Sequence, residues 1–217
     1  QRAGLAVVPV SINLSAQSFR EDGLVEMIAA SLREFSITPA LLEGEITESM
    51  LMKDVEYAVT RLHGLRAIGV ELAMDDFGTG YSSLAYLKRF PLNVLKIDRA
   101  FVKEVLTDNH DAAIAAAIIT LGRSMGLAVV AEGMESVEQA NFLFSLGCRL
   151  MQGFLFARPM PADAFAKLLR DGLPMPTGLR LEVAESGIAV PACGSLSASL
   201  LLSHPKMAFL VEQRAKY

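Results

Sequence analysis

The sequence predicts an α/β fold, a (β/α) TIM-like barrel that lacks its first one or two βα units and carries a C-terminal tail. Short apolar runs alternate with longer segments of helical period, which is typical of a parallel sheet built from βα units. Each predicted strand also ends in a polar residue. A barrel gathers its active site from the ends of several strands, whereas an open doubly wound sheet gathers it at one switch point. The distribution over six strand ends therefore favours the barrel.

Six βα units are predicted where a complete barrel has about eight. The predicted strands are 6–13, 41–47, 70–75, 93–98, 127–132 and 148–152. Strands buried on both faces read as continuous apolar runs, and this accounts for a hydrophobic content of 52%. Because the chain also begins abruptly at Gln1 without an initiator Met, we expect a processed chain or a fragment whose missing units lie at the front.

Three helices are predicted with clear boundaries. A helix over 109–125 is followed by Gly126 as its C-terminal stop, and Ser136 with Gln139 forms a capping box for a helix that ends at Gly147. An earlier helix presents one apolar face at steps of three or four residues, formed by Leu51, Val55, Val59, Leu62 and Leu65.

Composition excludes several classes of protein. The chain has 20 Lys and Arg against 24 Asp and Glu, and this net charge of -4 argues against binding a nucleic acid polymer. No stretch reaches the roughly 18 apolar residues of a membrane span. The two cysteines, Cys148 and Cys193, form neither a disulfide framework nor a metal-binding pair, which favours a cytoplasmic location.

The polar strand ends supply oxygen ligands without imidazole or thiolate, and this favours Mg²⁺ or Mn²⁺ over zinc. Adjacent carboxylates repel one another in a shared buried site, so a cation is their natural compensation. Two divalent ions about 3.5 to 4 Å apart activate water and stabilise a phosphoryl group under attack. The candidate metal ligands are Asn13, Glu45, Asp75, Asp76 and Glu132.

Two further features leave alternatives open. Lys96 either orients a water and stabilises negative charge, or merely pairs with Asp98 or Glu132. The glycine-rich segment 77–83 either closes over a ligand or is an ordinary βα turn. Its place directly after two carboxylates favours the functional interpretation.

Six ordered segments resemble the EAL family of bacterial cyclic di-GMP phosphodiesterases, over residues 5 to about 170. They read SINLS at 11–15, EITES at 45–49, DDFGTGYSSL at 75–84, LKID at 95–98, AEGME at 131–135 and QGF at 152–154. We therefore expect a partial EAL-type phosphodiesterase domain at 1–170. The tail at 171–217 has no assigned role, and a linker with a short amphipathic segment at 207–211 is the expectation there.

The resemblance implies a role for each metal-site residue. Asn13, Glu45 and Asp75 would ligate the first metal, with Asp75 bridging to a second near Asp76. Glu132 would complete the metal and water network. Lys96 would hold the attacking water, and Gln152 would help to position it.

Other residues are implied to act around the substrate. Glu48 and Glu135 resemble the pair that anchors the loop after the second carboxylate. The residues assigned by resemblance to that loop or to the substrate are Phe77, Gly78, Thr79, Gly80 and Asp98.

The implied reaction is hydrolysis of cyclic di-GMP to linear pGpG with two Mg²⁺ or Mn²⁺ ions. The resemblance also implies a homodimer, and a cyclase or sensor domain upstream in the parent protein.

One departure is large, because no Glu-Ala-Leu occurs in the sequence and the Glu of that motif is a metal ligand in the family. A non-catalytic cyclic di-GMP receptor or regulatory module, and an inactive fragment, are therefore the alternatives. Truncation explains the departure better than degeneration, since every later motif is intact.

Overall fold

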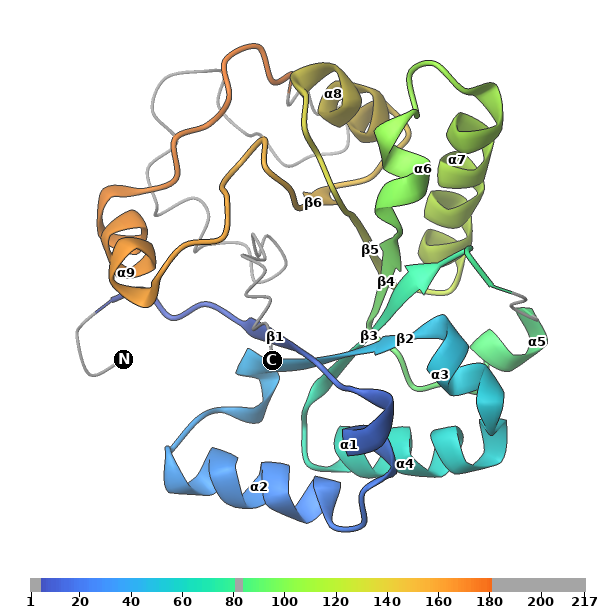
Figure 1. Cartoon of the computed structure of the whole chain (residues 1–217), viewed down its shortest axis with the longest axis vertical. Coiled ribbons are helices and arrows are strands. Elements are labelled where there is room, and N and C mark those ends of the chain that lie inside the picture. The colour runs from blue at the N-terminus through green and yellow to red at the C-terminus, as the bar shows by residue number, and fades with distance from the viewer. Residues whose placement is uncertain (1–4, 81–83, 181–217) are drawn as a thin grey trace.

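The computed structural model of the chain describes residues 5–80 and 84–180. Its centre is a parallel sheet in which the six strands follow one another in chain order, curled with the helices around its outer face (Figure 1). The strands are β1 Val10–Asn13, β2 Leu42–Thr47, β3 Glu71–Phe77, β4 Val94–Ile97, β5 Ala128–Ala131 and β6 Leu150–Met151. All six predicted strands are confirmed, and the partial TIM-like barrel is the observed fold.

The helices connect successive strands. They are α1 Ala16–Arg20, α2 Leu24–Glu34, α3 Glu48–Lys53, α4 Val55–Ala67, α5 Leu84–Leu87, α6 Arg99–Lys103, α7 Asn109–Ser124, α8 Val137–Ser145 and α9 Ala162–Asp171, with a 3-10 turn at Pro39–Leu41. The long helix before Gly126 and the capping box of Ser136 and Gln139 are both confirmed.

The prediction of one continuous helix through Leu51 to Leu65 is wrong. The segment forms α3 and α4, which meet at Asp54. The backbone of Asp54 leaves the helical region, and its side chain accepts a hydrogen bond of 3.1 Å from the Tyr57 amide as the N-cap of α4. Both helices keep their apolar faces on the sheet, because the break falls at one residue and leaves the spacing intact.

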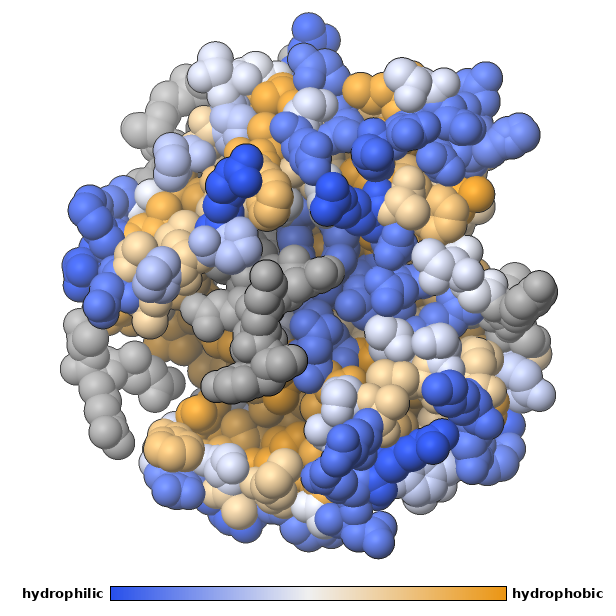
Figure 2. All heavy atoms as spheres, viewed as in Figure 1, coloured by the Kyte–Doolittle hydropathy of each residue, from blue (hydrophilic) through white to orange (hydrophobic). Residues whose placement is uncertain are grey.

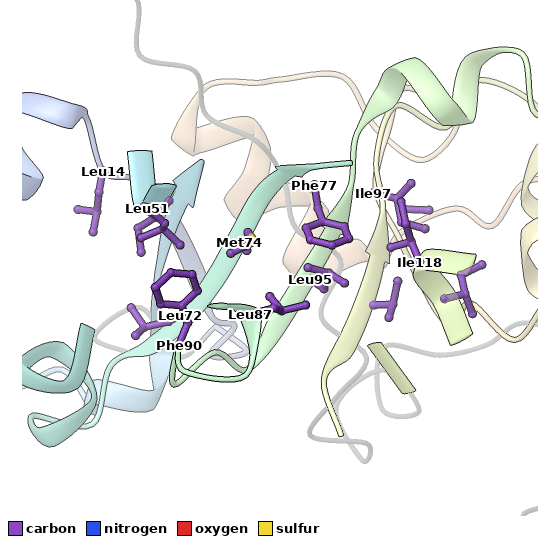
Figure 3. Close-up of a cluster of buried hydrophobic side chains, with 14 of the residues drawn as sticks. Leu14, Leu51, Leu72, Met74, Phe77, Leu87, Phe90, Leu95, Ile97 and Ile118 are labelled. Carbon is purple, nitrogen blue, oxygen red and sulfur yellow. The ribbon is translucent and has the colours of Figure 1, made fainter. Parts of the chain in front are cut away.

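Two apolar layers lie on opposite faces of the sheet because strand side chains alternate in direction. The larger layer lies between strands and helices and includes Met74, Leu95 and Ile97 (Figure 3). The smaller one lies on the inner, concave face and consists of Ala73, Val94 and Val130. We call this second set the inner apolar layer.

The described start of the predicted tail, residues 171–180, contacts α8 and the main core. The Asn141 side chain on α8 donates to the Gly178 carbonyl at 3.1 Å and accepts from the Arg180 amide at 2.7 Å. Leu179 packs against the main core. The first part of the tail is thus attached to α8. The predicted amphipathic segment at 207–211 lies outside the described residues.

Within the described residues, no helix is long and apolar enough to cross a membrane.

Candidate active site

A polar layer lies directly above the inner apolar layer, towards the carboxyl ends of the strands. Asp75, Lys96 and Glu132 each stand two residues after a member of the inner apolar layer. Because side chains two residues apart share a strand face, these three enter the barrel interior one step nearer its mouth. Glu45 on β2 and Gln152 after β6 join them, both buried. We call these five residues the polar layer.

Lys96 is the centre of the polar layer. Its ammonium lies 2.8 Å from Glu45 Oε1 and 3.6 Å from Asp75 Oδ1, and it forms a third ion pair with Glu132 Oε1. The Lys96 side chain is 2% exposed, so these contacts replace water as its solvation. Of the two interpretations of Lys96, pairing with Glu132 is observed, but within a four-residue cluster rather than as an isolated pair.

The charges in this cluster are unequal, because three carboxylates face one ammonium. Burial by itself would lower the pKa of Lys96, but the carboxylates of Glu132, Glu45 and Asp75 raise it above its usual value. Burial raises the pKa of Glu132 to about 7, against the opposing effect of Lys96. Lys96 is therefore charged at neutral pH, whereas Glu132 gains or loses a proton near neutrality.

A bulge at the end of β3 brings two consecutive carboxylates to the mouth. The pairing of β3 with β4 shifts register between Met74 and Phe77, and Asp76 has a φ of +55° in the left-handed region. The Asp76 amide donates to Asp75 Oδ1 at 3.0 Å. Burial, followed by a hydrogen bond with Asp98, raises the pKa of Asp76 to about 6. Asp98 in turn begins α6, where it accepts from the Ala100 amide at 2.6 Å.

The start of the glycine-rich loop rests on Glu48. The Gly78 amide donates to Glu48 Oε2 at 3.0 Å, and a Cβ at Gly80 would lie 2.6 Å from Glu48 Oε1. Glu48 is 1% exposed, and its Oε1 has no hydrogen-bond partner among the described residues. Glu48 therefore contacts the start of the loop, and its anchoring role stays a prediction. Thr79 Oγ1 donates to the Asp76 carbonyl at 2.8 Å, which ties the loop to the bulge.

Three other predicted residues, Phe77, Glu135 and Asn13, have surroundings of their own. The Phe77 side chain is buried in the main core beside Ile97 and Ile118, and its assignment to the loop or the substrate stays a prediction (Figure 3). Glu135 is half-exposed and pairs with Arg99 at 3.3 Å, and its anchoring role stays a prediction. Asn13 is exposed at the end of β1, in register with Glu45.

One buried carboxylate was not predicted. Glu43 is 7% exposed, lies two residues before Glu45 on the same face of β2, and accepts a hydrogen bond of 2.7 Å from Ser11 Oγ. Burial raises the pKa of Glu43. The alternation of β2 was the available signal, because it places Glu43 directly beneath Glu45.

Within the described residues, no three His, Cys, Asp or Glu side chains form a ready-made metal site. The Lys96 ammonium lies between the carboxylates instead. The donor chemistry nevertheless fits a hard divalent cation, because every candidate ligand is an oxygen and the cluster has an excess of negative charge. The buried Gln152 Oε1 adds an acceptor without a described partner.

Comparison with known proteins gives consistent matches. The chain is 49% identical over 154 residues to the bifunctional diguanylate cyclase/cyclic di-GMP phosphodiesterase MucR of Pseudomonas aeruginosa, which covers 71% of this chain and 22% of that protein. The chain thus spans about a fifth of the length of this curated relative.

Solved structures match as well. The PaMucR phosphodiesterase in complex with c-di-GMP has a TM-score of 0.73 and 48% identity, covering 76% of this chain and 66% of that one. A manganese and cyclic di-GMP complex of Klebsiella pneumoniae BlrP1 has a TM-score of 0.66 and 34% identity, covering 72% and 40%.

The family model described as the EAL domain matches residues 1–159, which contain the whole polar layer. With the fold, the ordered motifs and these similarities in agreement, the chain belongs to the EAL domain family.

Proposed function

We propose that this domain hydrolyses one phosphodiester bond of cyclic di-GMP to give linear pGpG, in bacterial second-messenger signalling, with Mg²⁺ or Mn²⁺ as cofactor. The observation that carries the proposal is the polar layer, where Glu45, Asp75 and Glu132 converge on Lys96 at the barrel mouth. Its support is that similar solved proteins are complexes with cyclic di-GMP, one of them with manganese.

Five residues would hold two divalent ions, namely Asn13, Glu45, Asp75, Asp76 and Glu132. Bound there, the ions would lower the pKa of a coordinated water and offset the negative charge of the phosphoryl group. The excess of carboxylates over ammonium groups gives these ions a favourable electrostatic environment.

The chain's own residues orient the reacting water. Lys96 remains charged at neutral pH, so it donates hydrogen bonds and does not act as a base. The Glu132 carboxylate, which lies beside the Lys96 ammonium, would accept a hydrogen bond from the water. The water oxygen forms a bond to phosphorus and the water loses a proton, while the bond from phosphorus to one ribose oxygen breaks. That ribose oxygen takes up a proton, so the net transfer is of one water proton to the leaving group.

The test of this function is Asp75→Asn, assayed by chromatography of pGpG formed from cyclic di-GMP with Mn²⁺. The change keeps side-chain shape but removes a carboxylate from the polar layer, and we expect turnover to fall at least about 100-fold. Glu71→Gln is the matched control, because Glu71 lies at the opposite end of the same strand. Undiminished turnover in Asp75→Asn would contradict the metal assignment.

A non-catalytic cyclic di-GMP receptor is the second candidate. One observation favours it, namely that the Lys96 ammonium lies among the carboxylates. Calorimetric binding of cyclic di-GMP with Ca²⁺ or Mg²⁺, combined with no pGpG in the presence of Mn²⁺, would favour the receptor over the enzyme. A homodimer, a cyclase or sensor domain elsewhere in the parent protein, and a cytoplasmic location stay predictions.

A further inference from the structure

Gln139 on α8 makes more contacts than a helix cap requires. It is 7% exposed. Its Oε1 accepts from the amides of Glu135 and Ser136 at 2.9 and 3.0 Å, which is the capping interaction. Its Nε2 donates in addition to the carbonyls of Val102 and Lys103 at 3.2 and 3.1 Å, and these residues end α6. A primary amide has two donor hydrogens, and here both have a partner.

These contacts join the two loops that carry polar groups at the mouth. The first is the segment 132–136, which begins with Glu132 and continues into α8. The second begins with Asp98 and continues into α6, which follows β4 without a further connection. The Gln139 side chain therefore connects the segment that follows β5 to the helix that follows β4, and we call this connection the bridge. Gln139 itself is not a member of the polar layer.

The segment 132–136 is held at its other residues as well. The Glu132 amide donates to the Ile97 carbonyl at 3.2 Å, and the Met134 amide donates to the Gln152 carbonyl at 3.0 Å. A Cβ at Gly153 would lie 2.2 Å from the Met134 nitrogen, so the backbones there are in direct contact. Two side-chain contacts join the segment to α6, namely the exposed pair of Glu135 with Arg99 at 3.3 Å and the buried contacts of Gln139 at the point where the loop turns into the helix.

We propose that Gln139 is a positioning residue that holds the segment 132–136 against α6 and thereby fixes the separation of Glu132 from Asp98. Its importance for metal binding rests on the proposed function, whereas the attachment of the loop to α6 does not. A buried residue that fixes the orientation of ligand-bearing segments commonly changes metal affinity by about 10- to 100-fold when it is altered.

The substitution Gln139→Glu distinguishes the hydrogen bonds that join Gln139 to α6 from the hydrogen bonds that cap α8. Glutamate is an ordinary capping-box residue and keeps the oxygen that accepts from the amides of Glu135 and Ser136. Its second oxygen has no hydrogen to donate at neutral pH, so the two bonds to α6 are lost. Ser136→Ala is the matched control. It removes the hydroxyl that accepts a hydrogen bond of 3.2 Å from the backbone amide of Gln139, and it leaves the side-chain bonds of Gln139 to α6 in place.

The first measurement is hydrogen exchange of backbone amides. We expect Gln139→Glu to speed exchange by about tenfold or more in both 132–136 and α6, and Ser136→Ala to speed it only within α8. In the unaltered chain, hydrogen exchange at increasing denaturant concentration should give the same opening free energy for the amide of Glu135 and for the amides of α6. Independent opening of the two segments in the unaltered chain would overturn the bridge, even if the Glu variant does not fold.

The second measurement is Mn²⁺ affinity by electron paramagnetic resonance of the free ion, at a temperature where all variants are folded. Gln139→Glu should weaken Mn²⁺ binding about tenfold, whereas Ser136→Ala should leave it unchanged. Equal affinity in the two variants would show that the bridge supports only stability. Should the unaltered chain bind no Mn²⁺, the metal-dependent function fails, and the exchange measurement alone decides the bridge.

Discussion

Lys96 is both a candidate catalytic group and the counter-ion of the polar layer. Its ammonium is the described cationic group that contacts Glu45, Asp75 and Glu132. Removal of one partner from a buried ion cluster costs about 3–5 kcal/mol, because the remaining charges lose their compensation. The residue therefore contributes to stability in the metal-free chain as well as to the proposed chemistry.

Lys96→Met should lower the free energy of unfolding by about 3–5 kcal/mol in urea with a metal chelator present. Combining it with Glu132→Gln should recover part of the loss, because one of the uncompensated carboxylates is then neutral. Lys103→Met makes the same change at an exposed position of α6 and should stay within about 0.5 kcal/mol of the unaltered chain. Coinciding urea midpoints for the two single variants would contradict a stabilising role for Lys96.

The polar layer was predictable from sequence at the level of residues because strand alternation is local. Asp75, Lys96 and Glu132 stand at regular spacing after apolar residues, and parallel strand ends meet at one mouth. The contacts of Phe77 and Gln139 were not predictable in the same way. They depend on which distant elements pack nearby, namely α7 against β3 and α6 against α8.

At the scale of elements, α7 lies close against β5. A Cβ at Gly122 would lie 2.3 Å from Val129 Cγ2, well inside van der Waals contact. Glycine in a helix interior usually costs about 0.5–1 kcal/mol relative to alanine. The close contact of α7 with β5 explains why residue 122 is a glycine. A side chain at this position would occupy the space of Val129 and push the helix away from the strand.

Gly122→Ala should therefore destabilise the chain by about 1–3 kcal/mol, although helix propensity alone favours alanine. A double-mutant cycle with Val129→Ala, measured by urea unfolding, should show favourable coupling, because the smaller partner makes room for the new methyl group. A Gly122→Ala variant more stable than the unaltered chain would show that α7 is free to move away from β5.

Element boundaries were the least predictable part of the fold. The break between α3 and α4 at Asp54 is a local capping event inside an unbroken apolar pattern. Periodicity reports which face of a helix is buried and is insensitive to a one-residue interruption. The strand ends were predicted within a few residues because the polar residues there coincide with the edge of the apolar runs.

At the scale of the whole molecule, β1 and β6 form the two edges of the described sheet. Val10 and Ile12 on β1 are 54% and 36% exposed, so this edge strand of the described sheet carries exposed apolar side chains. Such an edge is a site for association with another strand. Figure 2 shows apolar residues next to polar ones over the visible face of the molecule.

Val10→Lys should reduce self-association of the chain, because a charged residue on an edge strand opposes pairing. Sedimentation velocity over a concentration series measures the change. Met27→Lys is the control, since Met27 on α2 is equally exposed at 55% but does not lie on a strand. If the unaltered chain is monomeric at every concentration, or if both variants behave alike, the edge does not drive association.

The sequential strand order has a consequence for folding. Among the described residues, each strand pairs with the strands immediately before and after it in the chain, from β1 through β6. The sheet can thus grow one βα unit at a time, each unit docking on its predecessor, without waiting for a distant strand to close a long loop. In this respect the domain resembles a repeat protein, in which the loss of a terminal unit removes a single interface and leaves the others paired.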